Sequence, residues 1–264
     1  MNGRFVVRGT ALALLVALPI VAAALVLRGT DWFSAPIEIP PPPVIAAPRG
    51  APPAGPVGLI EQAQYGGGPY HGVGHGFVLR LADGGLVGIT TAHSLSFDAQ
   101  PPLRRVALMA AGMAVPAWEA DRLHGEPGTA RSGEDMTVDY VLLAISPDAT
   151  IDPGLVVQPD PRGLPQPGER VTLYTSVGGQ PRTFGGTIIS AEARAVWAAM
   201  DDDFDPGGLS GSPFISQHTG KVVGMLIAAA RRGGRLMLGL HPIDSLVKLA
   251  EAAEVFPIVE AYRR

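Results

Sequence analysis

Cysteine is absent from the 264-residue chain, so the sequence offers no disulfide framework and no thiolate for nucleophilic or metal chemistry. Aromatic residues make up only 6% of the chain and charged residues 17%. The net charge of -4 and the pI near 5.8 give no support to nucleic acid as a partner. Glycine and proline are plentiful by contrast, with 34 and 26 residues, which favours many turns and short strands over long helices.

Long hydrophobic runs are also scarce, and the one that stands out lies at the N-terminus. Residues 9–27 carry no charge, and as a helix they would span roughly 28 Å, close to the thickness of a bilayer's hydrocarbon core. Arg4 and Arg8 precede the run, and this excess of cations predicts a cytoplasmic N-terminus. We therefore expect residues 1–30 to form a transmembrane anchor, or a cleavable signal peptide, since Ala22–Ala24 supply small residues. In either case the rest of the chain is expected outside the cytoplasm, in the periplasm or the extracellular space.

Prolines dominate residues 31–58. Prolines at this density favour an extended polyproline II path. We expect a linker that would hold the following domain, residues 59–264, away from a membrane surface. A spacer without a ligand of its own is favoured over a segment recognised by an SH3-type partner.

Short apolar runs separated by turn residues continue through the domain. Asp83-Gly-Gly lies between the apolar runs at 76–81 and 86–90, which is a strong hairpin signal. A helical stripe of apolar residues predicts one late helix over 242–253. The pattern predicts an all-β barrel or sandwich. The further strand candidates are residues 105–110, 114–119, 138–145, 170–175, 183–189, 195–200, 213–215, 222–229 and 235–240.

Three residues stand in contexts that suit a single reaction. His93 follows Thr-Thr-Ala at a predicted strand end, Asp139 opens Asp-Tyr-Val-Leu-Leu, and Ser210 stands in Gly-Gly-Leu-Ser-Gly-Ser-Pro. A serine hydroxyl attacks a carbonyl only when an imidazole removes its proton and a carboxylate orients that imidazole. These residues are therefore the candidate base, orienting acid and nucleophile; Asp135 is a competing carboxylate, but no apolar strand follows it directly. The surrounding glycines would let the amides of Gly208 and Ser210 form an oxyanion hole.

These segments resemble the chymotrypsin-like (trypsin-fold) serine proteases, in the form found in bacteria. The resemblance implies two six-stranded antiparallel β-barrels with the three residues in the cleft between them, followed by a C-terminal helix. It also implies a peptidase S1 type of hydrolase that needs no cofactor or metal. It covers roughly residues 74–253 and rests on Gly74-His-Gly-Phe, Ile89-Thr-Thr-Ala-His, Asp139-Tyr-Val-Leu-Leu and Gly208-Leu-Ser-Gly-Ser-Pro.

The resemblance further implies a primary substrate pocket with a floor just before the nucleophile and a wall formed by a later strand. Small wall residues suggest an open pocket, and Asp205 would attract Lys or Arg if it were buried there. The neighbouring run Asp201–Asp203 is interpreted as a solvated loop, with a loose Ca²⁺ site as the alternative. His71 and His75 lie in a glycine-rich segment without a metal-binding motif, so no zinc site is expected. The implied pocket residues are Phe204, Asp205, Ile227, Ala228 and Ala229.

The sequence therefore predicts a membrane-anchored serine endopeptidase that acts outside the cytoplasm on protein or peptide substrates. A different class remains open, namely a catalytically silent protease fold kept as a binding or sensing module. Leu209, in place of the aspartate with which digestive members pair a new N-terminus, favours that alternative weakly and argues against activation by such an ion pair. An esterase with the same three residues is disfavoured, because Ser212 stands where the Gly-x-Ser-x-Gly elbow needs glycine.

Overall fold

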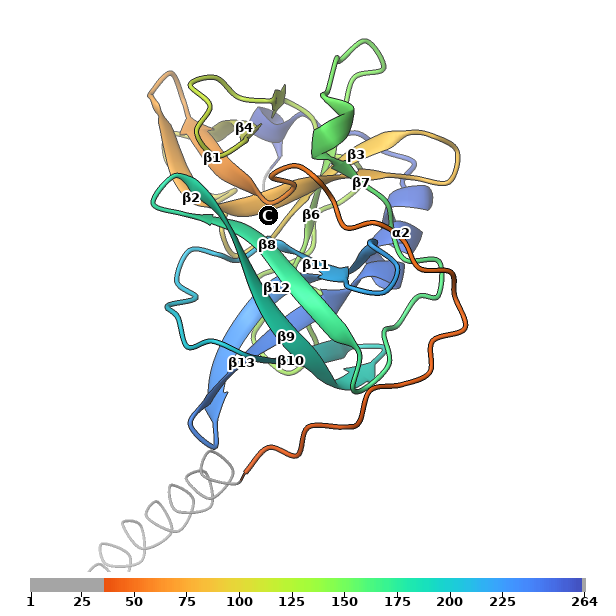
Figure 1. The fold of residues 1–264 in the computed structure, drawn as a ribbon. Coiled ribbons are helices and arrows are strands. Elements are labelled where there is room, and N and C mark those ends of the chain that lie inside the picture. The colour runs from red at the N-terminus through yellow and green to blue at the C-terminus, as the bar shows by residue number, and fades with distance from the viewer. Residues whose placement is uncertain (1–35, 263–264) are drawn as a thin grey trace, which may run out of the picture. The chain divides into compact units, whose positions relative to one another are not determined.

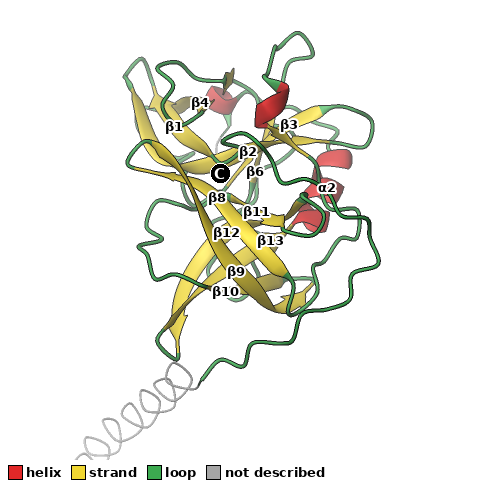
Figure 2. Ribbon diagram, in the orientation of Figure 1, coloured by secondary structure: helices red, strands yellow, loops and turns green. Residues whose placement is uncertain are grey.

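The computed structural model describes residues 36–262, which fold mainly into strands (Figures 1 and 2). The predicted anchor over residues 1–30 lies outside the described residues. Within residues 36–262, no helix is both long enough and apolar enough to cross a bilayer. Residues Glu38–Ala230 and the chain from Leu236 onward form one compact unit, which contains every candidate site residue.

The first lobe is a seven-stranded sheet. Six strands follow the order β5-β4-β1-β2-β3-β6, and β7 pairs in parallel with β2. The closed six-stranded barrel expected for this lobe is not shown, because the strand path runs from β5 to β6 without closing. Its edge strands β5 and β6 have only three and four residues, and a single bridge, Leu123 with Leu143, continues the pairing between this part of the chain and β6. The strands are β1 Leu59–Tyr65, β2 Tyr70–Arg80, β3 Leu86–Thr90, β4 Leu103–Met109, β5 Trp118–Ala120, β6 Val141–Ala144 and β7 Val156–Val157.

The second lobe is a closed six-stranded barrel in the order β10-β13-β12-β11-β8-β9, as the resemblance implied. The helix α2, Ile243–Glu251, follows the barrel, and two short 3₁₀ helices lie at Pro153–Leu155 and Val259–Ala261. α2 has the expected apolar stripe, because Leu246 and Ala250 are buried along with its first residue. The strands are β8 Arg170–Val177, β9 Gln180–Glu192, β10 Ala195–Met200, β11 Pro213–Ser216, β12 Val222–Arg232 and β13 Arg235–Pro242.

One hydrophobic cluster joins the two lobes and α2. Phe77 and Ile89 from the first lobe pack in it with Met225 from the second lobe and with Leu246 from the helix. Each of these four side chains is fully buried, and burial of one such side chain contributes about 1.5–3 kcal/mol. The cluster therefore fixes the lobes against each other close to the ends of β3 and β6, where the candidate site lies.

The proline-rich segment runs without regular secondary structure along the second lobe (red to orange in Figure 1). The His218 ring donates from Nε2 to the carbonyl of Ala47 at 2.6 Å, and the amide of Gly50 donates to the carbonyl of His218 at 2.9 Å. Over these residues the segment belongs to the folded unit, so it does not act as a free spacer there. The domain boundaries at residues 30 and 58 stay predictions.

Candidate active site

His93 and Asp139 are 46 residues apart in sequence and are brought together by neighbouring strands. His93 follows β3 and Asp139 precedes β6, and these two strands pair antiparallel, with Thr90 opposite Val141. The ring Nδ1 of His93 lies 2.8 Å from Oδ2 of Asp139. The aspartate side chain is 1% exposed and the histidine side chain 34%, so a buried carboxylate holds a ring that reaches solvent.

Backbone amides satisfy the rest of the Asp139 carboxylate. Oδ1 accepts from the amides of Ala92 at 2.8 Å and His93 at 3.1 Å, and Oδ2 also accepts from the amide of Arg131 at 3.0 Å. Burial opposes ionisation of Asp139, but these bonds and the His93 ring outweigh it and hold the pKa of the carboxyl below its ordinary value. An ionised carboxylate only accepts hydrogen bonds, so in the neutral His93 ring Nδ1 carries the proton and Nε2 has the lone pair.

Ser210 and the loop that carries His93 both lie close to Gly74. A Cβ built on Gly74 would lie 3.2 Å from the carbonyl oxygen of Ser210 and 3.4 Å from Cβ of Ser94, the residue that follows His93. The same Ser210 carbonyl accepts the amide of His75 at 2.8 Å. Among residues 36–262 the Ser210 hydroxyl makes no hydrogen bond. The structure therefore joins His93 to Asp139 directly and brings Ser210 near them with its hydroxyl unengaged.

The loop before Ser210 presents two unused amide donors. Gly208 adopts a left-handed φ of +75°, and the amide of Leu209 closes a turn by donating to the carbonyl of Pro206 at 3.1 Å. Within the described part of the chain, the amides of Gly208 and Ser210 on either side donate to no acceptor. Two free donors close to a serine hydroxyl are the arrangement that stabilises negative charge developing on a carbonyl oxygen.

The implied pocket residues fall into different environments. The half-buried Phe204 ring stacks on Phe184, with centroids 3.8 Å apart. Asp205 is exposed and its Oδ1 accepts the amide of Gly207 at 2.9 Å, so the hypothesis of a buried pocket acid there does not hold. On β12, exposure rises from Ile227, which is buried, through Ala228 to Ala229, which is exposed. Their assignment to a substrate pocket stays a prediction.

The first residue of the acidic run is engaged in an ion pair. Asp201 forms an ion pair with Arg170, in which Oδ1 lies 2.9 Å from Nη1. In the described part of the chain, no group of three or more potential His, Cys, Asp or Glu ligands is arranged to hold a metal ion. Asp201 is therefore committed to a surface ion pair between β8 and the end of β10.

Glu61 is a residue of the site region that the sequence analysis missed. It lies on β1, is fully buried, and its Oε2 lies 2.7 Å from Oγ of Ser94. Burial raises its pKa to about 8, more than the hydrogen bonds to Ser94 and Thr90 lower it. The side chain is therefore a neutral acid at neutral pH.

A neutral Glu61 leaves the single hydroxyl proton of Ser94 available for another acceptor, while Oε1 of Glu61 has no hydrogen-bond partner among the described residues. The Ser94 hydroxyl lies within hydrogen-bond distance of both Glu61 and the carbonyl of Thr91, at 2.7 Å and 2.9 Å, but it has only one proton. When Glu61 is protonated, it donates to Ser94, and Ser94 donates to Thr91. An ionised Glu61 would compete with Thr91 for that proton, directly beside His93.

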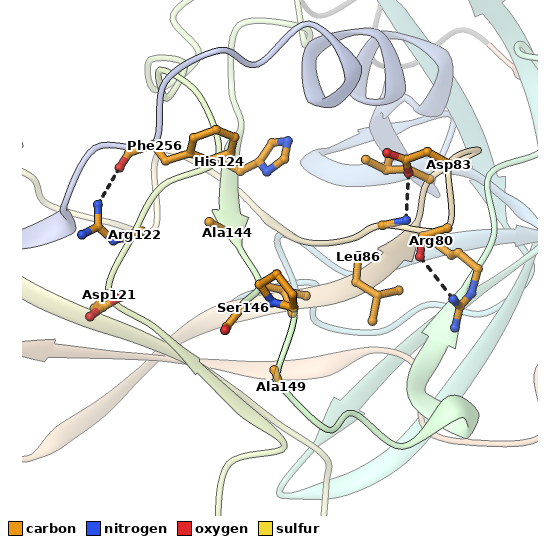
Figure 3. Close-up of a pocket in the computed structure, with 15 residues that line it drawn as sticks. Arg80, Asp83, Leu86, Asp121, Arg122, His124, Ala144, Ser146, Ala149 and Phe256 are labelled. Atoms are coloured by element: carbon orange, nitrogen blue, oxygen red, sulfur yellow. Dashed lines mark hydrogen bonds between the residues drawn. The ribbon is translucent and has the colours of Figure 1, made fainter.

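A pocket of about 850 Å³ opens elsewhere on the surface (Figure 3). Its lining includes Arg80, Asp83, Arg122, His124 and Phe256, and none of the three candidate catalytic residues. Several of its groups are engaged locally; for example, Arg122 donates to the carbonyl of Phe256 at 3.2 Å. The size of this pocket therefore gives no reason to move the candidate site away from His93.

No family model matches the sequence, and no curated protein matches it. Among solved structures, the Rv3671c protease from M. tuberculosis in its active form matches with a TM-score of 0.52 at 18% identity, covering 84% of this chain and 94% of that one. Tobacco etch virus protease in complex with product matches with a TM-score of 0.51 at 15% identity, covering 83% and 87%. Tobacco vein mottling virus protease matches with a TM-score of 0.50 at 13% identity, covering 84% and 94%. At these identities the likeness shows the fold alone, and that fold is the one of chymotrypsin-like proteases.

Proposed function

We propose that this protein is a serine endopeptidase that hydrolyses peptide bonds through an acyl-enzyme on Ser210. Nε2 of His93 takes the hydroxyl proton as Oγ attacks the peptide carbonyl, and later returns that proton to the leaving amine. Asp139 holds the ring in the required tautomer and stabilises the imidazolium. The amides of Gly208 and Ser210 hold the oxyanion of the tetrahedral intermediate. Water then repeats the attack on the ester and regenerates the free hydroxyl.

The observation that carries this proposal is the environment of Asp139. Burying a carboxylate is costly unless hydrogen bonds compensate for the lost water. Here three backbone amides donate to the carboxylate, and the fourth donor is the Nδ1 hydrogen of a partly exposed histidine. A purely structural ion pair would not need to leave Nε2 of His93 without a partner among residues 36–262. The absence of cysteine excludes a thiolate nucleophile on the same fold.

We also propose that the catalytic domain works outside the cytoplasm, tethered by the uncharged run at residues 9–27. The support is the distribution of charge around that run, with Arg4 and Arg8 before it. A peptide substrate is in keeping with the fold, since the tobacco etch virus protease was solved with its product.

The test uses the full-length chain, a fluorophosphonate probe and casein. The probe should label the wild type and Ser146→Ala but not Ser210→Ala; Ser146 is an exposed serine that lines the 850 Å³ pocket. Casein turnover should fall on the order of a million-fold in Ser210→Ala. Equal labelling of the wild type and Ser210→Ala would refute the assignment of the nucleophile. A wild type that neither reacts with the probe nor cleaves casein would favour the silent binding module.

A further inference from the structure

His75 connects the first lobe, the second lobe and the loop that carries Ser210. It lies on β2 with 6% of its surface exposed. Its Nδ1 lies 2.8 Å from the carbonyl oxygen of Gly208, and its Nε2 lies 2.8 Å from Oγ of Ser176 on β8. Neither nitrogen takes part in the proposed reaction. The role of the ring therefore lies in its contacts to Gly208 and Ser176.

The neighbours of the ring determine which nitrogen carries the proton. The backbone amide of Ser176 points to Nε2 at 3.3 Å, and an amide can only donate. Nε2 of His75 is therefore the acceptor, and in the neutral ring the proton resides on Nδ1. It follows that Nδ1 donates to the carbonyl of Gly208, which can only accept.

The ring stays neutral because it is buried. Burial lowers the pKa of His75 more than the hydrogen bonds to Gly208 and Ser176 raise it. A second proton on Nε2 would face the amide hydrogen of Ser176 and break that contact. The tautomer that donates to Gly208 is thus the one that the surroundings select.

With the hydrogen bond from His75 to Gly208, the peptide group between Gly207 and Gly208 is fixed by a side chain on each side. The peptide between Gly207 and Gly208 carries the Gly208 amide hydrogen, one of the two proposed oxyanion donors. On one side the amide of Gly207 is held by Asp205 at 2.9 Å, and on the other the carbonyl of Gly208 is held by His75 at 2.8 Å. Glycine at both positions would otherwise let this peptide rotate at little cost.

His75 also holds the second donor's residue through its own backbone. Its amide donates to the carbonyl of Ser210 at 2.8 Å, while its carbonyl accepts the hydroxyl of Thr90 at 2.8 Å. His75 therefore donates to the carbonyls of both Gly208 and Ser210, the two residues whose amides are the proposed oxyanion donors. The backbone contact survives any substitution of His75, whereas the contact to Gly208 depends on the ring.

We propose that His75 is a positioning residue for the oxyanion hole, which keeps the Gly208 amide available by donating from Nδ1 to the Gly208 carbonyl. This inference rests on the proposed function. It predicts that the loss of the Nδ1 donor slows formation of the tetrahedral adduct without weakening the initial binding of the reagent.

Two substitutions distinguish this positioning role from a purely structural role of the His75 contact with Ser176 on the second lobe. In His75→Asn the side-chain amide stands at the position of Nδ1 and keeps a donor for Gly208. In His75→Gln the amide group stands one atom further out, near the position of Nε2, and keeps a partner for Ser176. Each variant retains one of the two contacts of the ring.

The measurement is the reaction of the full-length chain with a fluorophosphonate, whose phosphoryl oxygen occupies the oxyanion position. The maximal rate and the half-saturating concentration are determined separately for each variant. His75→Gln should lower the maximal rate about tenfold or more with an unchanged half-saturating concentration, and His75→Asn should remain within a few-fold of the wild type. His71→Asn and His71→Gln, at an exposed histidine of the same strand, should match the wild type.

Each outcome decides between the two claims. Equal rates for His75→Gln and wild type, or equal losses for the Gln and Asn variants, would overturn the positioning role while the proposed function stands. A wild-type chain that does not react at all would overturn the proposed function, and this inference with it. Circular dichroism of every variant shows whether a loss of rate comes from a loss of fold.

Discussion

Glu61→Gln should make the protein more stable at neutral pH, although it removes a charge-bearing group. In the folded chain the pKa of Glu61 is raised from its ordinary value of 4.5 to about 8. Between these values the folded state holds one proton that the unfolded chain has released, so the free energy of unfolding falls as the pH rises. The slope is about 1.4 kcal/mol per pH unit, and the accumulated loss from pH 4.5 to pH 8 is about 5 kcal/mol. Glutamine has nearly the same shape, stays neutral and can still donate to Ser94.

The assay is urea denaturation of the full-length wild type and Glu61→Gln at intervals from pH 5 to pH 8.5. The difference in free energy of unfolding between the two chains should be smallest at pH 5 and grow in favour of the variant up to about pH 8, then level off. Taking the difference removes the contributions of other titrating groups, which both chains share. The matched control is Glu192→Gln at an exposed position, whose curve should run parallel to the wild type.

Two results would refute this reasoning. A constant difference between wild type and Glu61→Gln at every pH would mean that the folded chain does not raise the pKa of this carboxyl. A variant that becomes relatively less stable as the pH rises would mean that the ionised carboxylate stabilises the fold, in conflict with its complete burial.

Four further substitutions, one of them a matched control, test other parts of the structure. Asp139→Asn removes the charge that holds the proton on Nδ1 of His93, so under the proposed mechanism casein turnover should fall about 10⁴-fold; a loss below about tenfold would contradict the proposed orienting role. Arg162→Ala leaves two buried carboxylates without their shared cation and should lower the free energy of unfolding by about 3–5 kcal/mol in urea. Arg105→Ala, at an exposed ion pair, should cost less than about 1 kcal/mol, and equal costs for the two arginines would show that burial does not set the penalty. Gly211→Ala forces a side chain onto a φ of +91° with its Cβ 1.8 Å from a β2 carbonyl oxygen, so circular dichroism should show loss of the native fold, and a native spectrum would contradict that steric argument.

Strands with a clean apolar pattern and turn residues at both ends could be predicted closely. The ranges expected for β3 and β10, residues 86–90 and 195–200, agree with the structure at both ends. β1 was missed for a physical reason. Its inward positions are Leu59, Glu61 and Ala63, and a buried glutamate in the middle hides the alternation on which the prediction depends.

In the candidate site, too, some residues could be predicted from the sequence and others could not. Local motifs mark His93, Asp139 and Ser210, and the expected contact between the first two is present at 2.8 Å, while their catalytic roles stay predictions. Supporting contacts could not be predicted, because they join segments that only the fold brings together. The Arg131 amide reaches Asp139 from a loop, and the His75 ring bonds across the two lobes. Neither residue lies in a sequence motif that predicts such a contact.

The first lobe shows the limit of a prediction by resemblance. The strands β5 and β6 have only three and four residues and do not pair with each other. In the described part of the chain, only the bridge of Leu123 with Leu143 and the backbone hydrogen bonds beside it cross this seam. The expected strand at 114–119 begins only at Trp118, because the residues before it lie on a turn that follows β4. The resemblance correctly implied the closed second lobe, where β9 and β12 have 13 and 11 residues.

The hydrogen bonds between His218 of the second lobe and the proline-rich segment limit where the chain can be cleaved without loss of native contacts. Cleavage near residue 57 would leave the segment with Ala47 and Gly50 held at His218 by non-covalent contacts alone, and it would create a new terminus beside Val57, which is completely buried. A protease that releases this compact unit intact would therefore have to cut before Glu38, its first residue. A recombinant fragment meant to keep its native stability should begin there as well.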